Sequence, residues 1–164
     1  FMLKENGFET IYAADINPNA VISVQEEIEK HNCSDIIIAV NSNLFENLYH
    51  KCDLIVFNPP WLPGKNSQIL LDEAIYYPAE LFNRFFENAY DYLDDNGIIA
   101  FIFSNFAIEN KLTNKHPVLL ELENNKRFTK IKLSTQKVGK KSNKNKRQDR
   151  RRNESAELWL LRKS

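Results

Sequence analysis

The sequence of 164 residues predicts a single α/β domain, with a mostly parallel sheet, helices on both faces and a C-terminal antiparallel hairpin. Short apolar runs alternate with segments of helical periodicity over the first two thirds of the chain, a pattern typical of βα units. Two strand-like segments then follow one another near the C-terminus, joined by a loop, and predict the antiparallel pair. A chain of this length can bury the core of about one domain.

The first third of the chain is expected to carry two helices. Residues 1–6 have the pattern of a helix end, and Gly7 can stop that helix in a left-handed conformation. A second helix starts at Asn17 and Pro18, because Asn is a favoured cap and Pro is tolerated in the first helical turn. This helix is expected to end near His31.

Four short apolar runs are expected to form the parallel strands, since each has the length of a buried strand. They are residues 9–14, 36–40, 54–57 and 98–103. A long aromatic-rich helix is expected over residues 78–94, and Asn96-Gly97 is expected to stop it. Later in the chain a short helix follows Pro117. The two hairpin strands are residues 128–135 and 157–161.

Composition restricts the functional classes. No apolar run approaches the ~20 residues that cross a bilayer, so we expect a cytoplasmic protein without membrane contact. Cys33 and Cys52 are isolated thiols without the spacing of a metal or redox site. The three histidines are scattered along the chain and form no metal or catalytic constellation. No metal site is expected.

The zero net charge of the whole chain hides an asymmetry. Residues 137–152 contain nine Lys or Arg and one Asp, a local charge of +8, whereas the remainder carries −8. Because this segment has almost no apolar residues, it is expected to be a flexible insertion between the last two strands. The alternatives are a solubilising loop and a contact with nucleic acid phosphates. Lys140, Lys141 and Arg147 are the candidate contacts for the second alternative.

Four residues in a row, Asn58-Pro59-Pro60-Trp61, follow the strand predicted over residues 54–57. They therefore lie at the carboxyl end of a strand, where open α/β sheets bind ligands. The two prolines fix φ and supply no N–H, so they hold their carbonyls outward in a rigid turn. An Asn oxygen, a bare carbonyl and an indole face suit a flat ligand that carries an NH2 group. The alternative is an ordinary turn after a strand.

This motif resembles the Asn-Pro-Pro-aromatic signature of class I S-adenosylmethionine-dependent methyltransferases, the methyltransferase small-domain or amino-N group. The group acts on exocyclic amines of adenine or guanine and on glutamine amides. The nitrogen lone pair of these groups is delocalised. Enzyme oxygens that accept hydrogen bonds from both N–H groups free it for attack. The resemblance implies a Rossmann-like fold, S-adenosylmethionine as cofactor, and a catalytic role for Asn58, Pro59, Pro60 and Trp61.

The resemblance also implies a cofactor site. Asp15 matches the acidic residue that holds the ribose hydroxyls of S-adenosylmethionine, and Ile16 matches the apolar residue that packs on adenine. Asn43 stands where relatives often have an acidic residue for the adenine amino group, and the alternative for it is a turn-forming Asn. Asn58 is expected to border the cofactor as well as the acceptor.

The glycine-rich loop of this group has no counterpart among the four glycines of the sequence. We therefore expect a fragment that lacks the first strand of the fold and the loop that follows it. That strand would lie in the middle of the sheet, between the strands that end at Asp15 and Asn58. Without it, this stretch is expected to be poorly stable and to bind cofactor weakly.

The most favoured acceptor is a nucleobase amine, in RNA rather than DNA, because unpaired RNA bases are reached more cheaply than paired ones. Glu73 and Tyr77 are candidate substrate contacts, although a solvated helix start with a core tyrosine is the alternative for them. A protein glutamine is the alternative acceptor. The alternative from another class is a non-catalytic, methyltransferase-like module that binds nucleic acid.

Overall fold

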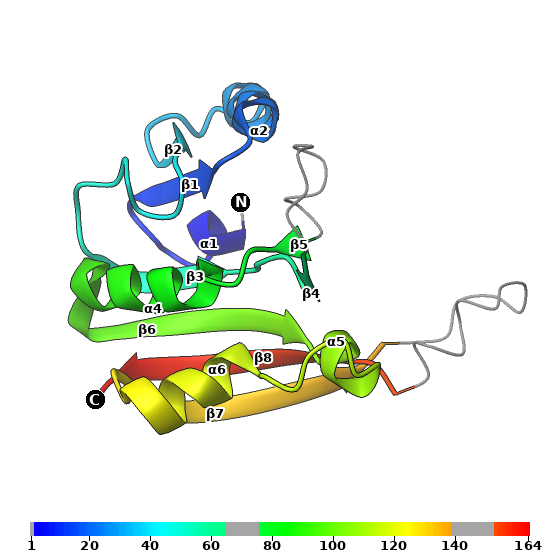
Figure 1. Cartoon of the computed structure of the whole chain (residues 1–164). Helices are drawn as coiled ribbons and strands as arrows, with labels where there is room; N and C mark the ends of the chain where they lie inside the picture. Colours follow the sequence, from blue (N-terminus) through cyan, green and yellow to red (C-terminus); the bar gives the residue numbers. More distant parts are fainter. Residues whose placement is uncertain (1, 65–75, 139–152) are drawn as a thin grey trace, which may run out of the picture. The chain divides into compact units, whose positions relative to one another are not determined.

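The computed structural model describes residues 2–64, 76–138 and 153–164. The chain divides into two compact units, Phe1–His50 and Lys51–Ser164 (Figure 1). The first unit holds α1 (Met2–Glu5), β1 (Ile11–Asp15), α2 (Pro18–Lys30) and β2 (Ile37–Asn41). None of the helices in the described ranges is long and apolar enough to cross a membrane.

The first unit is a βαβ unit. β1 and β2 pair in parallel, from Ile11 opposite Ile37 to Asp15 opposite Asn41, and α2 forms the connection. The predicted cap is confirmed, because the Asn17 side chain accepts a hydrogen bond from the Asn19 N–H at 3.0 Å. Gly7 has a φ of +83°, so the predicted left-handed stop after the first helix is also confirmed.

The second unit begins with β3 (Cys52–Phe57), β4 (Leu62–Pro63), β5 (Tyr76–Tyr77), α4 (Leu81–Tyr92) and β6 (Leu93–Ser104). It continues through α5 (Phe106–Glu109), α6 (Pro117–Leu120), the π-helix η1 (Glu121–Asn125), β7 (Phe128–Lys137) and β8 (Ser155–Lys163). Its main sheet has the order β3-β6-β8-β7. β3 and β6 are parallel, and β8 runs antiparallel to both β6 and β7, as the predicted hairpin requires.

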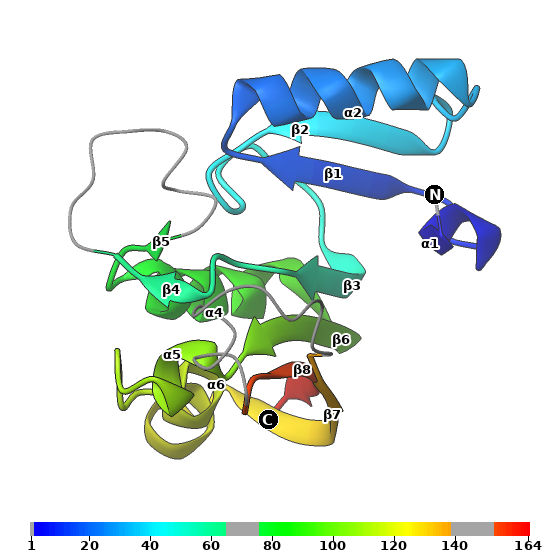
Figure 2. The same ribbon diagram turned by 90° about the vertical axis from the view of Figure 1, so that its right-hand side faces the viewer.

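Aromatic side chains hold α4 on this sheet. Phe85 of α4 stacks on Phe57 of β3 with ring centroids 4.0 Å apart, and Phe86 stacks on Phe101 of β6. α4, α5 and α6 lie on the same side of the sheet (Figure 2). Offset and edge contacts between buried aromatic rings add to the apolar area that they remove from water. The end of β3 is thereby fixed by packing.

The predicted role of Asn96-Gly97 is wrong. α4 already ends at Tyr92, and Asn96 and Gly97 lie inside β6. Cys52 pairs with Leu93 but Leu54 pairs with Ile98, so the register shifts in this part of β6. A Cβ added to Gly97 would lie 2.7 Å from a methyl carbon of Leu93, which is fully buried. Glycine is therefore needed here for close packing and not as a helix stop.

The predicted fold class is confirmed, with βα units followed by an antiparallel pair. β1 and β3 each pair with a strand on one side, and no strand of the described ranges pairs with the other side of either. The prediction of a missing first strand stays a prediction. The prediction of one domain over residues 1–164 stays a prediction, and residues 139–152 of the basic insertion lie outside the described ranges.

Candidate functional site

The turn Asn58-Pro59-Pro60-Trp61 begins directly after the last residue of β3, Phe57. Packing against Phe85 and Phe101 holds Phe57 in place, so the turn starts from a rigid point. Pro59 is buried and Pro60 is half-buried, whereas Asn58 is exposed. The prolines thus anchor the turn and leave the Asn58 side chain accessible.

Two polar groups of this turn lack partners. Within the described ranges, the Asn58 side-chain amide has no hydrogen-bond partner. Trp61 is half-buried, and its buried indole Nε1 has no acceptor among the residues that the structure describes. Burying such a donor unpaired costs about 1–3 kcal/mol, so buried polar groups of this kind are uncommon in folded proteins. The turn therefore offers the exposed Asn58 amide to a ligand.

The short strands β4 and β5 follow the turn and pair in parallel, Leu62 with Tyr76 and Pro63 with Tyr77. The Gly64 N–H donates to the Tyr77 carbonyl at 3.0 Å. A Cβ added to Gly64 would lie 2.9 Å from the Tyr76 Cβ, so glycine permits this close approach. This pairing ties Tyr77, one of the candidate substrate contacts, to the segment that follows Asn58, although Tyr77 lies 19 residues from Asn58 along the chain.

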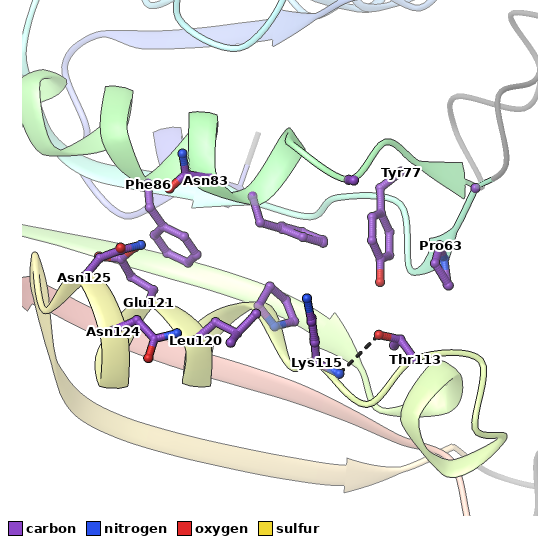
Figure 3. A pocket seen from close by; sticks show the side chains of 14 residues that line it. Pro63, Tyr77, Asn83, Phe86, Thr113, Lys115, Leu120, Glu121, Asn124 and Asn125 are labelled. Atoms are coloured by element: carbon purple, nitrogen blue, oxygen red, sulfur yellow. Dashed lines mark hydrogen bonds between the residues drawn. The ribbon is translucent and has the colours of Figure 1, made fainter.

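A cavity of about 480 Å³ lies in the second unit beside this segment. One wall comes from residues 77–86, around the start of α4, and the other from residues 113–125, around α6 and η1 (Figure 3). Pro63 and Gly64 close the end nearest the turn. Its volume is within the range of small-ligand sites, about 300–1,000 Å³.

The proposed cofactor residues lie in the first unit. Asp15 and Ile16 are exposed, and Ile16 offers an apolar surface of 48% relative exposure. The Asp15 Oδ1 accepts a hydrogen bond from the Asn17 N–H at 2.8 Å. The Asn43 Nδ2 donates to the Glu46 Oε1 at 3.1 Å, which leaves the Asn43 Oδ1 to accept from an amine. The donor and acceptor chemistry fits an adenosine, with a carboxylate, an apolar surface and an amide oxygen.

Asn41 is a residue that the sequence reasoning missed. Its Nδ2 donates to the Asp15 carbonyl at 3.1 Å and to the Ile16 carbonyl at 3.0 Å. It thereby fixes the backbone at both proposed cofactor residues. The signal available in the sequence was its place at the end of a predicted strand parallel to the one that ends at Asp15. Glu73, Lys140, Lys141 and Arg147 lie outside the described ranges.

A buried polar cluster supports the wall of residues 113–125. The His116 Nδ1 accepts from the Leu119 N–H, so its Nε2 carries the proton and donates to the Glu157 Oε2 at 2.8 Å. The Trp159 Nε1 donates to the same oxygen at 2.8 Å. Burial by itself would raise the pKa of Glu157, but the hydrogen bonds from His116 and Trp159 outweigh it and lower that pKa below 4.5.

The Glu157 cluster predicts a pH dependence of stability. A carboxyl whose pKa is lower in the folded state stabilises the protein above its unfolded pKa, and this contribution is lost as pH falls through the folded pKa. Stability is therefore expected to fall below about pH 4.5, more steeply in the wild type than in Glu157→Gln. Urea unfolding from pH 3 to pH 7 measures both slopes, and equal slopes would contradict the role of Glu157.

The fold and the strand-end turn define a Rossmann-like protein with a turn suited to a planar amine. The chain belongs to the methyltransferase small domain family, which it matches over residues 1–132. S-adenosylmethionine is the methyl donor of such a methyltransferase, so the predicted cofactor agrees with the family.

Two curated relatives and one solved structure are similar to the chain. It is 30% identical over 118 residues to a Methanocaldococcus jannaschii protein named provisionally as a protein N5-glutamine methyltransferase, covering 68% of this chain and 58% of that protein. It is 33% identical to the ribosomal protein uL3 glutamine methyltransferase of Francisella tularensis, covering 57% of this chain and 34% of that enzyme. A solved Pyrococcus horikoshii protein shares the fold, with a TM-score of 0.64, 14% identity, and coverage of 100% of this chain and 76% of that one.

Proposed function

We propose that the protein of which this chain is at least a part transfers a methyl group from S-adenosylmethionine to the side-chain amide nitrogen of a protein glutamine. The observation that carries the proposal is the exposed Asn58 amide, without a partner in the described ranges and directly after β3. The chain spans 58% and 34% of the two relatives that are named as glutamine methyltransferases, and their names support glutamine as the acceptor.

The chain's own residues would act by holding the acceptor. The Asn58 Oδ1 and the Pro59 carbonyl accept hydrogen bonds from the two N–H groups of the amide nitrogen, and the Trp61 ring packs on the amide plane. Amide resonance makes this nitrogen a poor nucleophile, and the two hydrogen bonds favour the geometry in which its lone pair is free. The bonds strengthen as the nitrogen becomes tetrahedral, so they stabilise the transition state more than the bound substrate.

When bound, the cofactor would supply a methyl group on a positively charged sulfur. The new N–C bond would form as the S–C bond breaks, S-adenosylhomocysteine would leave, and the methylated nitrogen would lose one proton to water. Asp15 would bind the ribose hydroxyls, Ile16 would pack on the adenine, and Asn43 would accept from the adenine amino group. Asn41 would hold the backbone of Asp15 and Ile16 through its two hydrogen bonds. Precise positioning of the two reactants supplies much of the rate of such a displacement.

A nucleobase amine is the second candidate acceptor. The observation that favours it is the charge of residues 137–152, nine Lys or Arg against one Asp. Nine cations can make several phosphate contacts, and an RNA base presents the same planar amine to the turn. Under this candidate, deletion of residues 137–152 weakens RNA binding and reduces its dependence on salt concentration.

The two acceptors are distinguished by the product. The chain is incubated with tritiated S-adenosylmethionine and, in parallel, with a ribosomal protein fraction or with total tRNA. The labelled material is then digested and identified by mass spectrometry. N5-methylglutamine supports the first candidate and a methylated nucleoside the second. No labelled product with either substrate, from a chain that binds the cofactor, would overturn both.

A further inference from the structure

One end of the cavity between α4 and α6 carries hydrogen-bond donors that have no partner in the described part of the chain. Tyr77 is only 8% exposed, and no described residue accepts a hydrogen bond from its hydroxyl. Its ring packs edge-on against Phe82, so the side chain is fixed in place. Burial raises the pKa of Tyr77, which keeps the hydroxyl protonated and able to donate. A hydroxyl on a buried side chain usually has a hydrogen-bond partner, and a ligand in the cavity would supply one.

Two further donors reach the same end from the opposite wall. Lys115 extends into the cavity toward the side from which Tyr77 extends (Figure 3). Lys115 forms no ion pair with any residue of the described ranges. The Thr113 Oγ1 accepts from the Lys115 N–H at 3.1 Å, so the threonine hydroxyl proton remains available to donate. An ammonium and two hydroxyls without a facing carboxylate form a site for an anion.

Glu121, the other charged residue of the described lining, is already paired. The Glu121 carboxylate accepts from the Arg127 Nη2 at 2.6 Å and from the Asn125 Nδ2 at 2.9 Å. This pair leaves the ammonium of Lys115 as the charge without a counter-ion on the described lining. Phe82, Phe86 and Leu120 lie between the two polar ends and provide an apolar floor. The cavity therefore suits an anionic group that is carried on an apolar stem.

The cavity lies close to the turn that holds the acceptor. Pro63 and Gly64 line it, and they follow Asn58 by five and six residues. Because a chain spans at most about 3.6 Å per residue, Gly64 lies within roughly 22 Å of Asn58. Six extended residues of a substrate polypeptide can bridge the same distance, so an acidic residue six positions from a glutamine at the turn can reach the cavity.

We propose that this cavity binds an acidic side chain of the acceptor polypeptide, at a position about six residues from the methylated glutamine. The Tyr77 hydroxyl, the Thr113 hydroxyl and the Lys115 ammonium donate to its carboxylate, and the stem packs against Phe82 and Leu120. The inference rests on the proposed glutamine acceptor. It adds a rule of substrate choice that the turn alone cannot provide, since every glutamine carries the same amide.

The test uses a matched pair of blocked peptides. One is acetyl-Glu-Ala-Ala-Ala-Ala-Ala-Gln-Ala-amide, in which Gln lies about six positions after Glu as the distance requires, and the other has Gln in place of Glu. NMR titration of the chain without cofactor measures both dissociation constants. We expect the Glu peptide to bind about tenfold more tightly than the Gln peptide, since hydrogen bonds to an ionised group are the stronger kind. Equal affinity for the two peptides would overturn the proposal.

Three variants locate the effect. Tyr77→Phe and Lys115→Gln are each expected to weaken binding of the Glu peptide about tenfold and to leave the Gln peptide unchanged. Lys132→Gln removes an exposed charge on β7, outside the cavity lining, and is expected to change neither. An equal loss with Lys132→Gln would overturn the site. A uridine hexanucleotide that binds more tightly than the Glu peptide, and whose binding Lys115→Gln abolishes, would also overturn the site. The cavity would then bind a phosphate.

The readout is binding, so it separates this inference from the proposed function. If the chain prefers the Glu peptide but methylates neither glutamine nor a nucleobase, the proposed function fails and the carboxylate site stands. If glutamine is methylated at the same rate in both peptides and both bind equally, the proposed function stands and the carboxylate site fails.

Discussion

Replacing Asn58 with alanine is expected to lower the rate of methyl transfer by about a hundredfold or more, with cofactor affinity nearly unchanged. The Asn58 oxygen has no partner among the described residues, so its removal leaves the fold intact. It contributes a hydrogen bond that strengthens as the acceptor nitrogen becomes tetrahedral. Loss of such a contact lowers the rate and leaves ground-state binding nearly unchanged. Single-turnover rates and a cofactor titration measure the two quantities.

Two further variants make this result specific. Asn58→Asp keeps an accepting oxygen at the same position, so its rate is expected to fall between those of the wild type and Asn58→Ala. Asn153→Ala removes an exposed asparagine and is expected to leave the rate unchanged. If Asn58→Ala lowers the rate and the cofactor affinity by equal factors, Asn58 is a cofactor-binding residue and its role toward the acceptor is refuted.

Replacing Arg127 with leucine is expected to destabilise the chain by roughly 3–5 kcal/mol, because it leaves the Glu121 carboxylate buried without its counter-ion. Glu121 is 1% exposed and receives three hydrogen bonds from Arg127, at 2.6, 3.0 and 3.2 Å. Burial by itself would raise the pKa of Glu121, but the hydrogen bonds from Arg127 and Asn125 lower it overall. The free energy of urea unfolding measures the loss.

The double variant Glu121→Leu/Arg127→Leu provides the control for this prediction. It removes both charges together, and a buried ion pair replaced by apolar residues is often nearly neutral for stability. Most of the stability lost in Arg127→Leu is therefore expected to return. The deficit of Arg127→Leu is also expected to shrink at low pH, where a lone Glu121 becomes neutral. A double variant as unstable as Arg127→Leu would contradict this account.

Local signals were sufficient for most of the fold. Asn17 caps α2 because an Asn oxygen reaches the N–H two residues later, and this depends on neighbouring residues only. The hairpin of β7 and β8 followed from two alternating segments. The prediction for Asn96-Gly97 was wrong because a pair that can stop a helix can also lie at a shift of strand register. Here the close packing of Gly97 against Leu93 determines which of the two forms.

The candidate site was predicted only in part, because local signals mark some of its residues and tertiary contacts bring the others together. Asn58 and Trp61 stand in one motif, and Asp15 closes a strand, so each carries a local signal. Tyr77, Thr113 and Lys115 line one cavity although they are up to 38 residues apart in sequence. Asn41 acts on Asp15 from 26 residues away, through a hydrogen bond that depends on the pairing of β1 with β2. Contacts of this kind arise from tertiary structure, and no fixed spacing in the sequence predicts them.

The most direct measurement follows the side-chain amide signals of Asn58 and the indole signal of Trp61 by NMR. The chain is saturated with S-adenosylhomocysteine, and N-acetylglutamine amide is then added. A planar amide held by the turn predicts that both signals shift together and saturate at one acceptor concentration. If both signals stay unmoved at a concentration that saturates methyl transfer, the acceptor is held elsewhere and the role assigned to this turn is wrong.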